Sequence, residues 1–506
     1  MEVSPVIRLH ASDGVVIARS TIAPATTVES VVAIDRIPPG HKIAVRPHAK
    51  GEPVHRYGQI IGFATEAISP GQHVHVHNMS MGDFARDYAF GQDAKPTAMI
   101  SPPATFEGIR RADGRAATRN YIGVLTSVNC SAHVAGLIAD VFKRNPFADN
   151  DPLADYPKVD GVVALTHKTG CGMAAGEPLH VLRRTLAGYA RHPNFSHVVV
   201  IGLGCEVNQI GGLIAEQKLS DRLRNMTIQS VGGTRKTVEA GVEFVREVLA
   251  ESNRVRRETI LAGELIVALQ CGGSDGYSGV SANPSLGVAS DLVVRNGGSV
   301  ILSETTETYG AEHLFTRRAV SREVGEKLVA LMKWWEDYTA KNGAEINANP
   351  SPGNKAGGLT TILEKSLGAM AKAGSTNLVD VVKYAQQVTA KGFVFMDTPG
   401  YDPVSATGQV AGGANVVCFT TGRGSVFGCK PAPSIKIATN SSMYQRLQDD
   451  MDINCGTILE GDETVEQAGQ RIFDTILRVA SGEKSKSEQS DFGSAEFAPW
   501  QLGATV

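Results

Sequence analysis

Three histidines, His73, His75 and His77, alternate with valine in the segment GQHVHVHNMS, residues 71–80. Alternation with a period of two predicts a β-strand that directs all three imidazoles to one face of a sheet. Side chains two residues apart on a strand are separated by roughly 7 Å, which is wide for ligands of one ion. Two interpretations stay open: a solvated strand face, or a metal site that one of these histidines forms with His10 or His41.

Polar and reactive side chains also follow the apolar segments that we expect to be parallel strands. Ligands of open α/β sheets bind at the carboxyl ends of the strands. The residues at these positions are Cys130, His167, Cys171, Cys205, Glu206, Cys271, Ser274, Asp275, Glu304, Asp397 and Arg423. One cysteine after a strand is usually a small buried filler. Four cysteines in this position keep metal or iron–sulfur ligation open as an equal alternative.

The segment SPGNKAGG, residues 351–358, combines a turn with Asn354 and Lys355. It lacks the spacing of a Walker phosphate loop. The segment is either a loop that presents one amide and one ammonium group to an anionic substrate, or a plain surface turn.

The composition is that of an ordinary globular protein. Of 506 residues 20% are charged, and the net charge of -3 gives no electrostatic reason to expect nucleic acid or an acidic membrane surface as a partner. The first residues do not read as a signal peptide, and no run of about 18 apolar residues predicts a membrane span. We therefore expect a cytoplasmic protein whose seven cysteines are reduced thiols.

The order of strand-like and helix-like segments along the chain predicts a multidomain α/β protein. Residues 1–91 hold short strand candidates and predict a small, mostly-β domain, and the proline-bearing residues 92–106 predict a linker. Apolar strands then alternate with amphipathic helices, which predicts two α/β units with mainly parallel sheets, at 107–257 and 258–485. Among the expected strand segments are HVVVIGLG, LIVALQCGG and DLVVRNGGSVILSE. Residues 486–506 are expected to be a tail on the surface.

Several motifs resemble one known family. They are LHASDGVVIA, IPPGHKIA, RRADGRAATRN, THKTGCG, VIGLGCE, QCGGSDGYSGVSANP, NPSPGNKAGG, TTGRGSVFG and KIATN, in this order along the chain. This sequence is similar to the altronate and galactarate dehydratases, hydro-lyases that remove water from sugar acids. The resemblance implies an N-terminal SAF-type (β-clip) domain, a divalent cation, iron(II) or manganese(II), and a 2-keto-3-deoxy acid as product. HVHVHN favours D-altronate as substrate, whereas MDINCGTI favours galactarate; other aldonates and aldarates stay open.

The reaction that the resemblance implies assigns roles to residues. Proton abstraction next to a carboxylate needs a base with a pKa near neutrality, for which His167 is the first candidate, and Lys355 or Arg423 would hold the carboxylate. Ser274 and Asp275 would bind substrate hydroxyls, with Arg119, Asn120 and Asn354 as further binding residues. The expected metal ligands are His10, His41 and His77. The alternative set is Cys130, Cys171, Cys205 and Cys271, which would hold iron or a cluster.

Two other functions remain open at this stage. SAF-type domains also occur in proteins that bind sugar-acid groups without turning them over, so a sugar-acid sensor is possible. A sulfolactate sulfo-lyase has a similar arrangement but is divided between two chains, which the single chain here argues against. A small-molecule sugar acid is the expected partner in each enzymatic case, and homo-oligomers are common for α/β proteins of this size.

Overall fold

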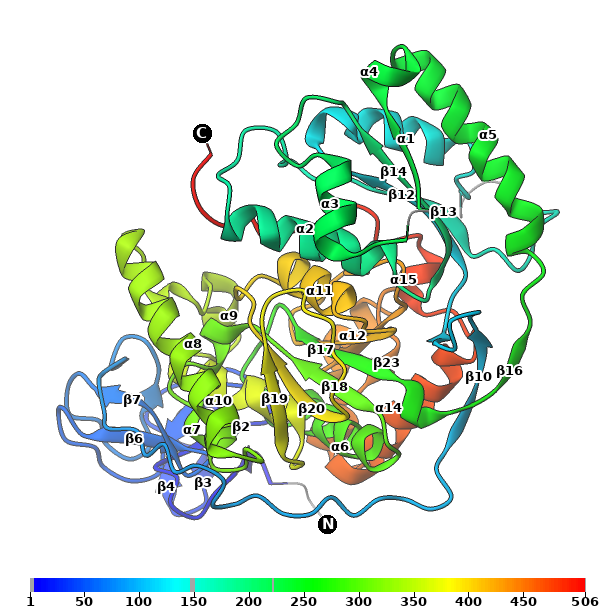
Figure 1. Cartoon of the computed structure of the whole chain (residues 1–506). Coiled ribbons are helices and arrows are strands. Elements are labelled where there is room, and N and C mark those ends of the chain that lie inside the picture. Colours follow the sequence, from blue (N-terminus) through cyan, green and yellow to red (C-terminus); the bar gives the residue numbers. More distant parts are fainter. Residues whose placement is uncertain (1–3, 146–150, 221–222, 506) are drawn as a thin grey trace.

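The computed structural model describes residues 4–145, 151–220 and 223–505, which form three units (Figure 1). The first unit is a β domain built from short antiparallel strands. One sheet has the order β1 (Val6–Ile7), β2 (Val15–Ala18), β5 (Lys42–Ala44), β8 (His73–Val74), and another the order β6 (Pro53–Arg56), β7 (Gln59–Ala64), β9 (Met79–Ser80); a hairpin pairs β3 (Thr27–Val28) with β4 (Val31–Val32). The expected mostly-β start is confirmed.

The histidine segment is not the continuous strand that the alternation predicts. Strand β8 ends at Val74, and a turn follows. The side chain of Asn78 makes this turn, because its Oδ1 accepts from the amide of His75 at 2.9 Å and its Nδ2 donates to the carbonyl of His73 at 2.9 Å. Asparagine competes with the sheet for these backbone groups, so the single residue after the repeat decides the conformation.

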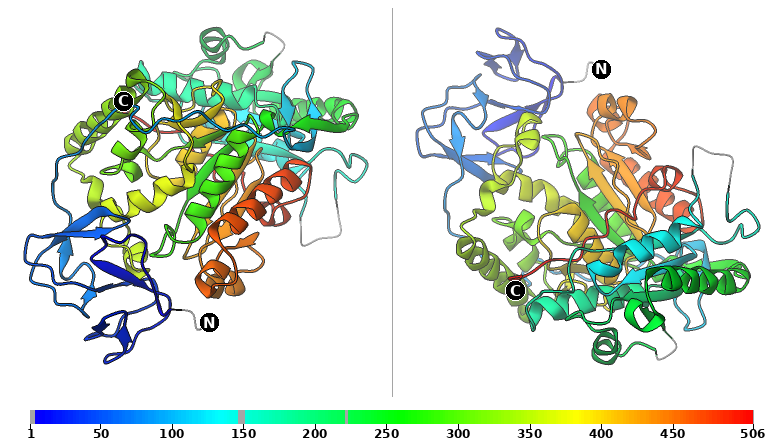
Figure 2. Two further views of the ribbon diagram at one scale, coloured as in Figure 1. Left: turned by 90° about the horizontal axis from the view of Figure 1, so that it is seen from below. Right: turned by 90° about the horizontal axis from the view of Figure 1, so that it is seen from above.

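The first unit docks on the third through a buried ionic cluster. Glu364 on α10 (Ile362–Met370) accepts from Lys42 at 2.9 Å and from Arg56 at 2.6 Å, and all three side chains are buried. Burial opposes the charge on Glu364, but the two cations outweigh it and lower its pKa to about 2. Both views in Figure 2 show the first unit beside the third, and the linker then crosses the molecule towards the second.

A small antiparallel sheet, β11 (Ala116–Ala117), β10 (Thr105–Arg110), β16 (Arg257–Leu261), marks where the chain enters and leaves the second unit. The second unit has a parallel sheet of the order β13 (Gly161–Leu165), β12 (Tyr121–Thr126), β14 (Phe195–Gly202), β15 (Arg224–Thr227). Ile122 and Val124 pack with α1 (Ala132–Asp140) and α5 (Thr234–Ser252). Leu125 packs with α2 (Glu177–Ala190) and α3 (Ile210–Gln217), in a core that extends into the third unit.

The third unit is a seven-stranded parallel sheet. Its order is β19 (Leu378–Val382), β20 (Gly392–Met396), β18 (Ser299–Leu302), β17 (Ile266–Cys271), β21 (Val416–Thr421), β22 (Ser434–Ala438), β23 (Ile453–Asn454). Strands β17, β18, β20, β21 and β22 are almost entirely buried, as expected for a sheet covered on both faces. The expected parallel α/β architecture is confirmed.

The segment DLVVR, expected in a strand, instead ends helix α6 (Ala282–Arg295), where Val293 and Val294 are buried. The other main helices are α8 (Arg322–Lys341), α11 (Asp402–Ala411) and α14 (Val465–Ala480). Shorter ones are α4 (Ile228–Val231), α7 (His313–Thr316), α9 (Pro352–Ala356), α12 (Ser441–Arg446), α13 (Thr457–Glu460) and α15 (Lys486–Gln489), with 3-10 turns η1 (Asn129–Ser131), η2 (Ala262–Glu264), η3 (Thr305–Thr308), η4 (Ile346–Ala348) and η5 (Ala371–Ala373). No helix in the described part of the chain is long and apolar enough to cross a membrane.

Aromatic residues of the C-terminal stretch pack against the core, whereas the sequence suggests a tail on the surface. Phe497 is buried and packs edge-on against Tyr189 of α2, with ring centroids 4.8 Å apart. Trp500 stacks on Trp335 of α8 at 5.4 Å. This last stretch therefore joins the second and third units.

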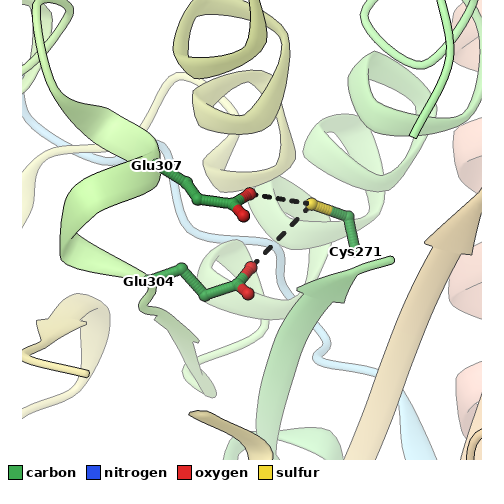
Figure 3. A group of neighbouring side chains, drawn as sticks. All are labelled: Cys271, Glu304 and Glu307. Atoms are coloured by element: carbon green, nitrogen blue, oxygen red, sulfur yellow. Dashed lines mark hydrogen bonds between the residues drawn. The ribbon is translucent and has the colours of Figure 1, made fainter. Parts of the chain in front are cut away.

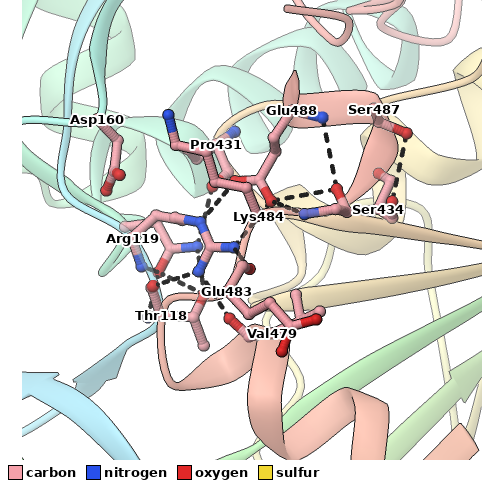
Figure 4. Close-up of polar contacts among 12 residues, drawn as sticks. Thr118, Arg119, Asp160, Pro431, Ser434, Val479, Glu483, Lys484, Ser487 and Glu488 are labelled. Carbon is pink, nitrogen blue, oxygen red and sulfur yellow. Dashed lines mark hydrogen bonds and ion pairs between the residues drawn. The ribbon is translucent and has the colours of Figure 1, made fainter. Parts of the chain in front are cut away.

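Arg119 joins the second and third units and Asn120 holds the second unit together, so both predicted binding residues are bonded to the chain itself. The Arg119 guanidinium is buried and donates to both carboxylate oxygens of Glu488, at 2.5 and 2.8 Å, and to the carbonyls of Val479 and Glu483 (Figure 4). Asn120 is fully buried and donates to the carbonyls of Lys158 and Ser252. These side chains have no donor left for a ligand.

Candidate functional site

A thiol and two carboxylates converge at the carboxyl edge of the seven-stranded sheet. Cys271 ends β17, Glu304 follows β18, and Glu307 lies in η3 (Figure 3). The Cys271 Sγ lies 3.9 Å from Glu304 Oε2 and 3.9 Å from Glu307 Oε2. In the part of the chain that the structure describes, this is the one group of at least three His, Cys, Asp or Glu side chains whose donor atoms all lie within 4.8 Å of one another.

Glu304 has two features of a ligand. Its backbone lies in the left-handed region at φ 66°, which is a strained conformation for a residue with a Cβ. A hydrogen bond from the backbone N–H of Glu304 to Thr398 Oγ1, at 2.8 Å, helps to hold this conformation. Its Oε1 is buried without any hydrogen-bond partner. A buried carboxylate oxygen without a partner is costly, and a cation would compensate it.

Two lysines complete the buried cluster. Lys365 Nζ donates to Glu307 Oε1 at 2.6 Å, and Lys372 Nζ donates to Cys271 Sγ at 2.8 Å. Burial opposes the charge of Glu307, but its ion pair with Lys365 outweighs this and lowers its pKa. Burial, followed by the charge of Glu307, raises the pKa of Glu304 well above its ordinary value. Burial also raises the pKa of the Cys271 thiol to about 12.

These donors fit a divalent cation. A bound cation deprotonates its ligands, which would remove the cost of charging Glu304 and Cys271 and would pair the free Glu304 oxygen. Carboxylate oxygens suit manganese(II), and a thiolate adds affinity for iron(II). Among the described residues, this group matches the implied metal better than the histidines do.

Asp402, the first residue of α11, lies next to this cluster. A Cβ placed on Gly272 would lie 2.1 Å from Asp402 Oδ2, so a larger residue after Cys271 would displace the Asp402 carboxylate. Burial, followed by the charge of Glu307, raises the pKa of Asp402 to about 6. A carboxyl group with this pKa is suited to proton transfer near neutral pH.

A cavity of about 620 Å³ lies beside the loop that follows Cys271, at the end of this loop that carries Asp275 and Tyr277. Asp275 and Arg423 line it, together with Arg19, Tyr277, Asn440 and Arg446. Asp275 accepts from Thr439 Oγ1 at 3.0 Å and from Asn440 Nδ2 at 3.2 Å, and burial raises its pKa. A larger cavity of about 700 Å³, around Arg295 and Arg318, contains none of the residues predicted for the site.

The segment 351–358 shapes this cavity through its backbone. Ser351 is the N-cap of α9, and Asn354 completes the capping box, with its Oδ1 accepting from the amide of Ser351 at 3.0 Å. The Nδ2 of Asn354 donates to the carbonyl of Ser274 at 2.8 Å. Ala356 and Gly357 line the cavity, whereas Lys355 is half-buried beside it. Asn354 thus holds the loop that carries Asp275 through the backbone carbonyl of Ser274, and of the predicted residues Asp275 and Arg423 line the cavity.

Four histidines form a cluster between the first unit and α9. The ring centroid of His41 lies 5.1 Å from that of His73 and 4.9 Å from that of His75. The ring centroids of His73 and His77 lie 5.4 Å apart. His41 Nε2 is hydrogen-bonded to the carbonyl of Ala356 at 3.2 Å, and His75 Nε2 to the carbonyl of Lys355 at 2.9 Å. His41 Nδ1 and His73 Nε2 are hydrogen-bonded to each other at 3.0 Å. His10 is bonded to Ser12 instead, and no ring contact among the described residues joins it to this cluster.

The histidine cluster should make stability fall with acidification. Burial, followed by the neighbouring charges, lowers the pKa of His73 to about 3 and that of His75 to about 4. The unfolded chain, with ordinary histidine pKa values of about 6.5, then binds up to ~2 more protons than the native protein between pH 4 and 6. The urea midpoint should therefore decrease as the pH falls below about 6.5, and less steeply in His73→Gln/His75→Gln. An unchanged dependence in this variant would contradict the assignment.

His167 has a structural role and not the predicted catalytic one. It is buried at the end of β13, its Nε2 meets the carbonyl of Thr126 at 2.9 Å, and its Nδ1 accepts from the amide of Thr169 at 3.3 Å. Burial lowers its pKa to about 4. Because both ring nitrogens are bonded to backbone, this neutral imidazole fixes the turn before Cys171.

The four predicted cysteines divide between two sites. Cys130, Cys171 and Cys205 are exposed at the second unit's sheet, whereas Cys271 is buried in the third unit with Glu304 and Glu307. The sequence had placed Glu304 at a strand end without a role. It did not single out Glu307, Lys365, Lys372 or Asp402. The acidic SETTE stretch after the strand was the available signal for Glu307.

Comparison with known proteins identifies the three units. Residues 4–82 match the altronate/galactarate dehydratase SAF domain, which confirms the expected SAF-type start. Residues 108–253 match the second domain of D-galactarate dehydratase/altronate hydrolase, and residues 262–505 match the C-terminal domain of D-galactarate/altronate dehydratase.

Relatives match over nearly the whole chain. A galactarate dehydratase (L-threo-forming) from Escherichia coli (strain K12) is 39% identical, with 94% of this chain and 93% of the relative covered. An altronate dehydratase from Bacillus subtilis (strain 168) is 34% identical, with 99% of both covered. The (2R)-sulfolactate sulfo-lyase subunit beta from Chromohalobacter salexigens is 30% identical over 79% of this chain and 97% of its own. The chain therefore belongs to the altronate/galactarate dehydratase family of hydro-lyases.

Proposed function

We propose that this protein is a metal-dependent dehydratase that converts D-altronate to 2-dehydro-3-deoxy-D-gluconate. The observation that carries the proposal is the buried Cys271, Glu304 and Glu307 group, with one unpaired carboxylate oxygen, at one end of a loop whose other end faces an arginine-lined cavity. The altronate dehydratases among the relatives and the histidine segment HVHVHN favour D-altronate.

Different residues of the site have different roles in the dehydration. Cys271, Glu304 and Glu307 would hold iron(II) or manganese(II), which supplies positive charge against the enediolate that develops when the proton next to the carboxylate is lost. Arg423 binds the substrate carboxylate, and Asp275 orients substrate hydroxyls from its rigid hydrogen-bonded position. Asp402, whose pKa is raised to about 6, removes the proton from the carbon next to the carboxylate. The 3-hydroxyl takes up a proton and leaves as water, and the resulting enol tautomerises to the 2-keto-3-deoxy acid.

Galactarate is the second candidate substrate. The cavity is lined by three arginines, Arg19, Arg423 and Arg446, with Asp275 and Glu460 as its acidic lining residues. A dicarboxylate would use two of these arginines, and the 39% identical relative is a galactarate dehydratase. A sugar-acid sensor would not need Asp402 or the buried metal ligands beside its binding cavity, and the sulfo-lyase relative is a separate beta subunit.

The test is an assay for 2-keto-3-deoxy acid on anaerobically purified protein, with and without added iron(II) or manganese(II). D-Altronate, galactarate and other hexonates would be compared. Metal-dependent turnover of D-altronate is expected. Turnover of galactarate alone would replace the proposed substrate, and binding of a sugar acid without turnover would support the sensor.

Replacing Arg423 with alanine should mainly weaken substrate binding. Loss of the charge-assisted hydrogen bonds to the carboxylate is expected to raise KM about 30-fold, or ~2 kcal/mol, with a smaller effect on kcat. Steady-state kinetics would measure this, with Arg322→Ala as the control, because Arg322 is an exposed arginine of α8 that contacts Glu326 and the Phe90 ring and lies outside the cavity lining. An unchanged KM would remove Arg423 from the substrate site.

A further inference from the structure

Three exposed cysteines lie at one edge of the second unit, and the proposed dehydration site does not use them. Cys130 follows β12, Cys171 follows β13, and Cys205 follows β14. These strands are neighbours in the parallel sheet, with β12 in the centre. Because the carboxyl ends of parallel strands meet at one edge, the three thiols belong to adjacent loops.

Hydrogen bonds tie these loops together directly beside the cysteines. The amide of Asn129, next to Cys130, donates to the carbonyl of Thr169 at 3.0 Å. The amide of Asn208 donates to the carbonyl of Gly170, next to Cys171, at 3.0 Å. Glu206, next to Cys205, accepts from Ser127 Oγ at 2.7 Å. Each loop is thus bonded to another within a few residues of its cysteine.

The close approach of the loops also explains one glycine. A Cβ on Gly170 would lie 2.4 Å from the carbonyl oxygen of Ser127, and the residue has φ +99°. Only glycine permits this contact. The turns that carry Cys130 and Cys171 are therefore packed backbone to backbone.

The three sulfur atoms interact but do not converge as ligands of one ion would. The pKa of the Cys130 thiol is raised, first by burial and then by the neighbouring sulfur atoms of Cys171 and Cys205. They are nevertheless not all within 4.8 Å of one another. One tetrahedral zinc ion, with Zn–S bonds of about 2.3 Å, would hold its thiolates roughly 3.8 Å apart. A larger inorganic core fits the wider spacing.

We propose that Cys130, Cys171 and Cys205 bind a four-iron iron–sulfur cluster, separate from the Cys271 site. A cluster of this type has four irons, so three cysteines leave one iron without a thiolate and open to an oxygen ligand. Gln229 Nε2 already donates to Cys205 Sγ at 3.5 Å, and such hydrogen bonds to sulfur tune iron–sulfur clusters. All three thiols are free and exposed, as assembly of a cluster requires.

Iron and acid-labile sulfide would be measured on protein purified without oxygen and reconstituted with iron and sulfide. About four irons and four sulfides per chain are expected, with broad visible absorbance that air bleaches. Cys130→Ser, Cys171→Ser and Cys205→Ser should each lose most of the sulfide. Cys455→Ser, a buried cysteine of the third unit, should retain it, with circular dichroism as the check on folding.

Two outcomes would overturn the proposal: stoichiometric zinc without sulfide in the wild-type protein, or full sulfide in the folded cysteine variants. Glu304→Gln should keep its sulfide, because Glu304 belongs to the other site. Sulfide content does not depend on turnover, so a protein that dehydrates none of the acids tested and still holds sulfide would refute only the proposed substrate.

Discussion

Replacing Glu304 with glutamine should lower kcat by about 10³-fold, or ~4 kcal/mol, and release the bound metal. Glutamine keeps the size of the side chain but removes the negative charge that would compensate a cation beside Cys271 and Glu307. The unpaired Glu304 oxygen lies in one buried group with Cys271 and Glu307, which is where a cation would be held. Metal content by mass spectrometry and turnover by the keto-acid assay would be measured together.

Two control variants make this result specific. Glu312→Gln changes another buried glutamate of the same segment, whose partners are Arg86 and Tyr88, so it reports the cost of neutralising a buried carboxylate outside the metal group. His77→Ala tests the histidine ligands that the sequence favoured. Retention of metal by Glu304→Gln with its loss in His77→Ala would move the metal site to the first unit.

The sequence predicted the architecture well because strand and helix periods are local. The alternation of buried strands and amphipathic helices placed the units, and the carboxyl ends of strands located Cys271, Asp275 and Arg423. The predictions for the histidine strand and for His167 were wrong because side chains form hydrogen bonds with backbone groups. Asn78 bonds the backbone and ends the histidine strand, and backbone partners occupy both nitrogens of His167. Asparagine and histidine can each make such bonds, but residue type alone does not say where they are made.

The remaining site residues depend on contacts between distant segments. Lys372 reaches Cys271 from η5, and Lys365 reaches Glu307 from α10. Neither lysine follows a strand, so the rule that found Cys271 could not find them. The RRADGRAATRN motif led to the opposite error, a predicted binding residue that does not belong to the site. The guanidinium of Arg119 can bind a carboxylate with two hydrogen bonds, but the carboxylate that it binds is Glu488 of the chain itself.

Asp402→Asn should reduce kcat by about 10²- to 10³-fold and change the pH profile. As the base, Asp402 acts in its deprotonated form, and its pKa of about 6 lies above the ordinary aspartate value because of burial and Glu307. In the wild-type protein kcat/KM should therefore fall at acidic pH, at or below about 6, since the carboxylate becomes protonated and a cation on Glu307 would offset part of the charge that raises its pKa. Asparagine cannot titrate, so the remaining activity of the variant should lack this acidic limb.

Asp397→Asn is the matched control for this result. Asp397 is also a buried aspartate with a raised pKa at the carboxyl edge of the same sheet, but its Oδ1 accepts from Thr305 Oγ1 at 2.6 Å and from Trp335 Nε1 at 2.9 Å. Its loss should reduce stability and leave the acidic limb in place. If the limb near pH 6 persisted in Asp402→Asn and disappeared in Asp397→Asn, the base would be Asp397. Only a group that both faces the reaction and titrates near neutrality can move this limb, which separates catalysis from the structural cost shared by both variants.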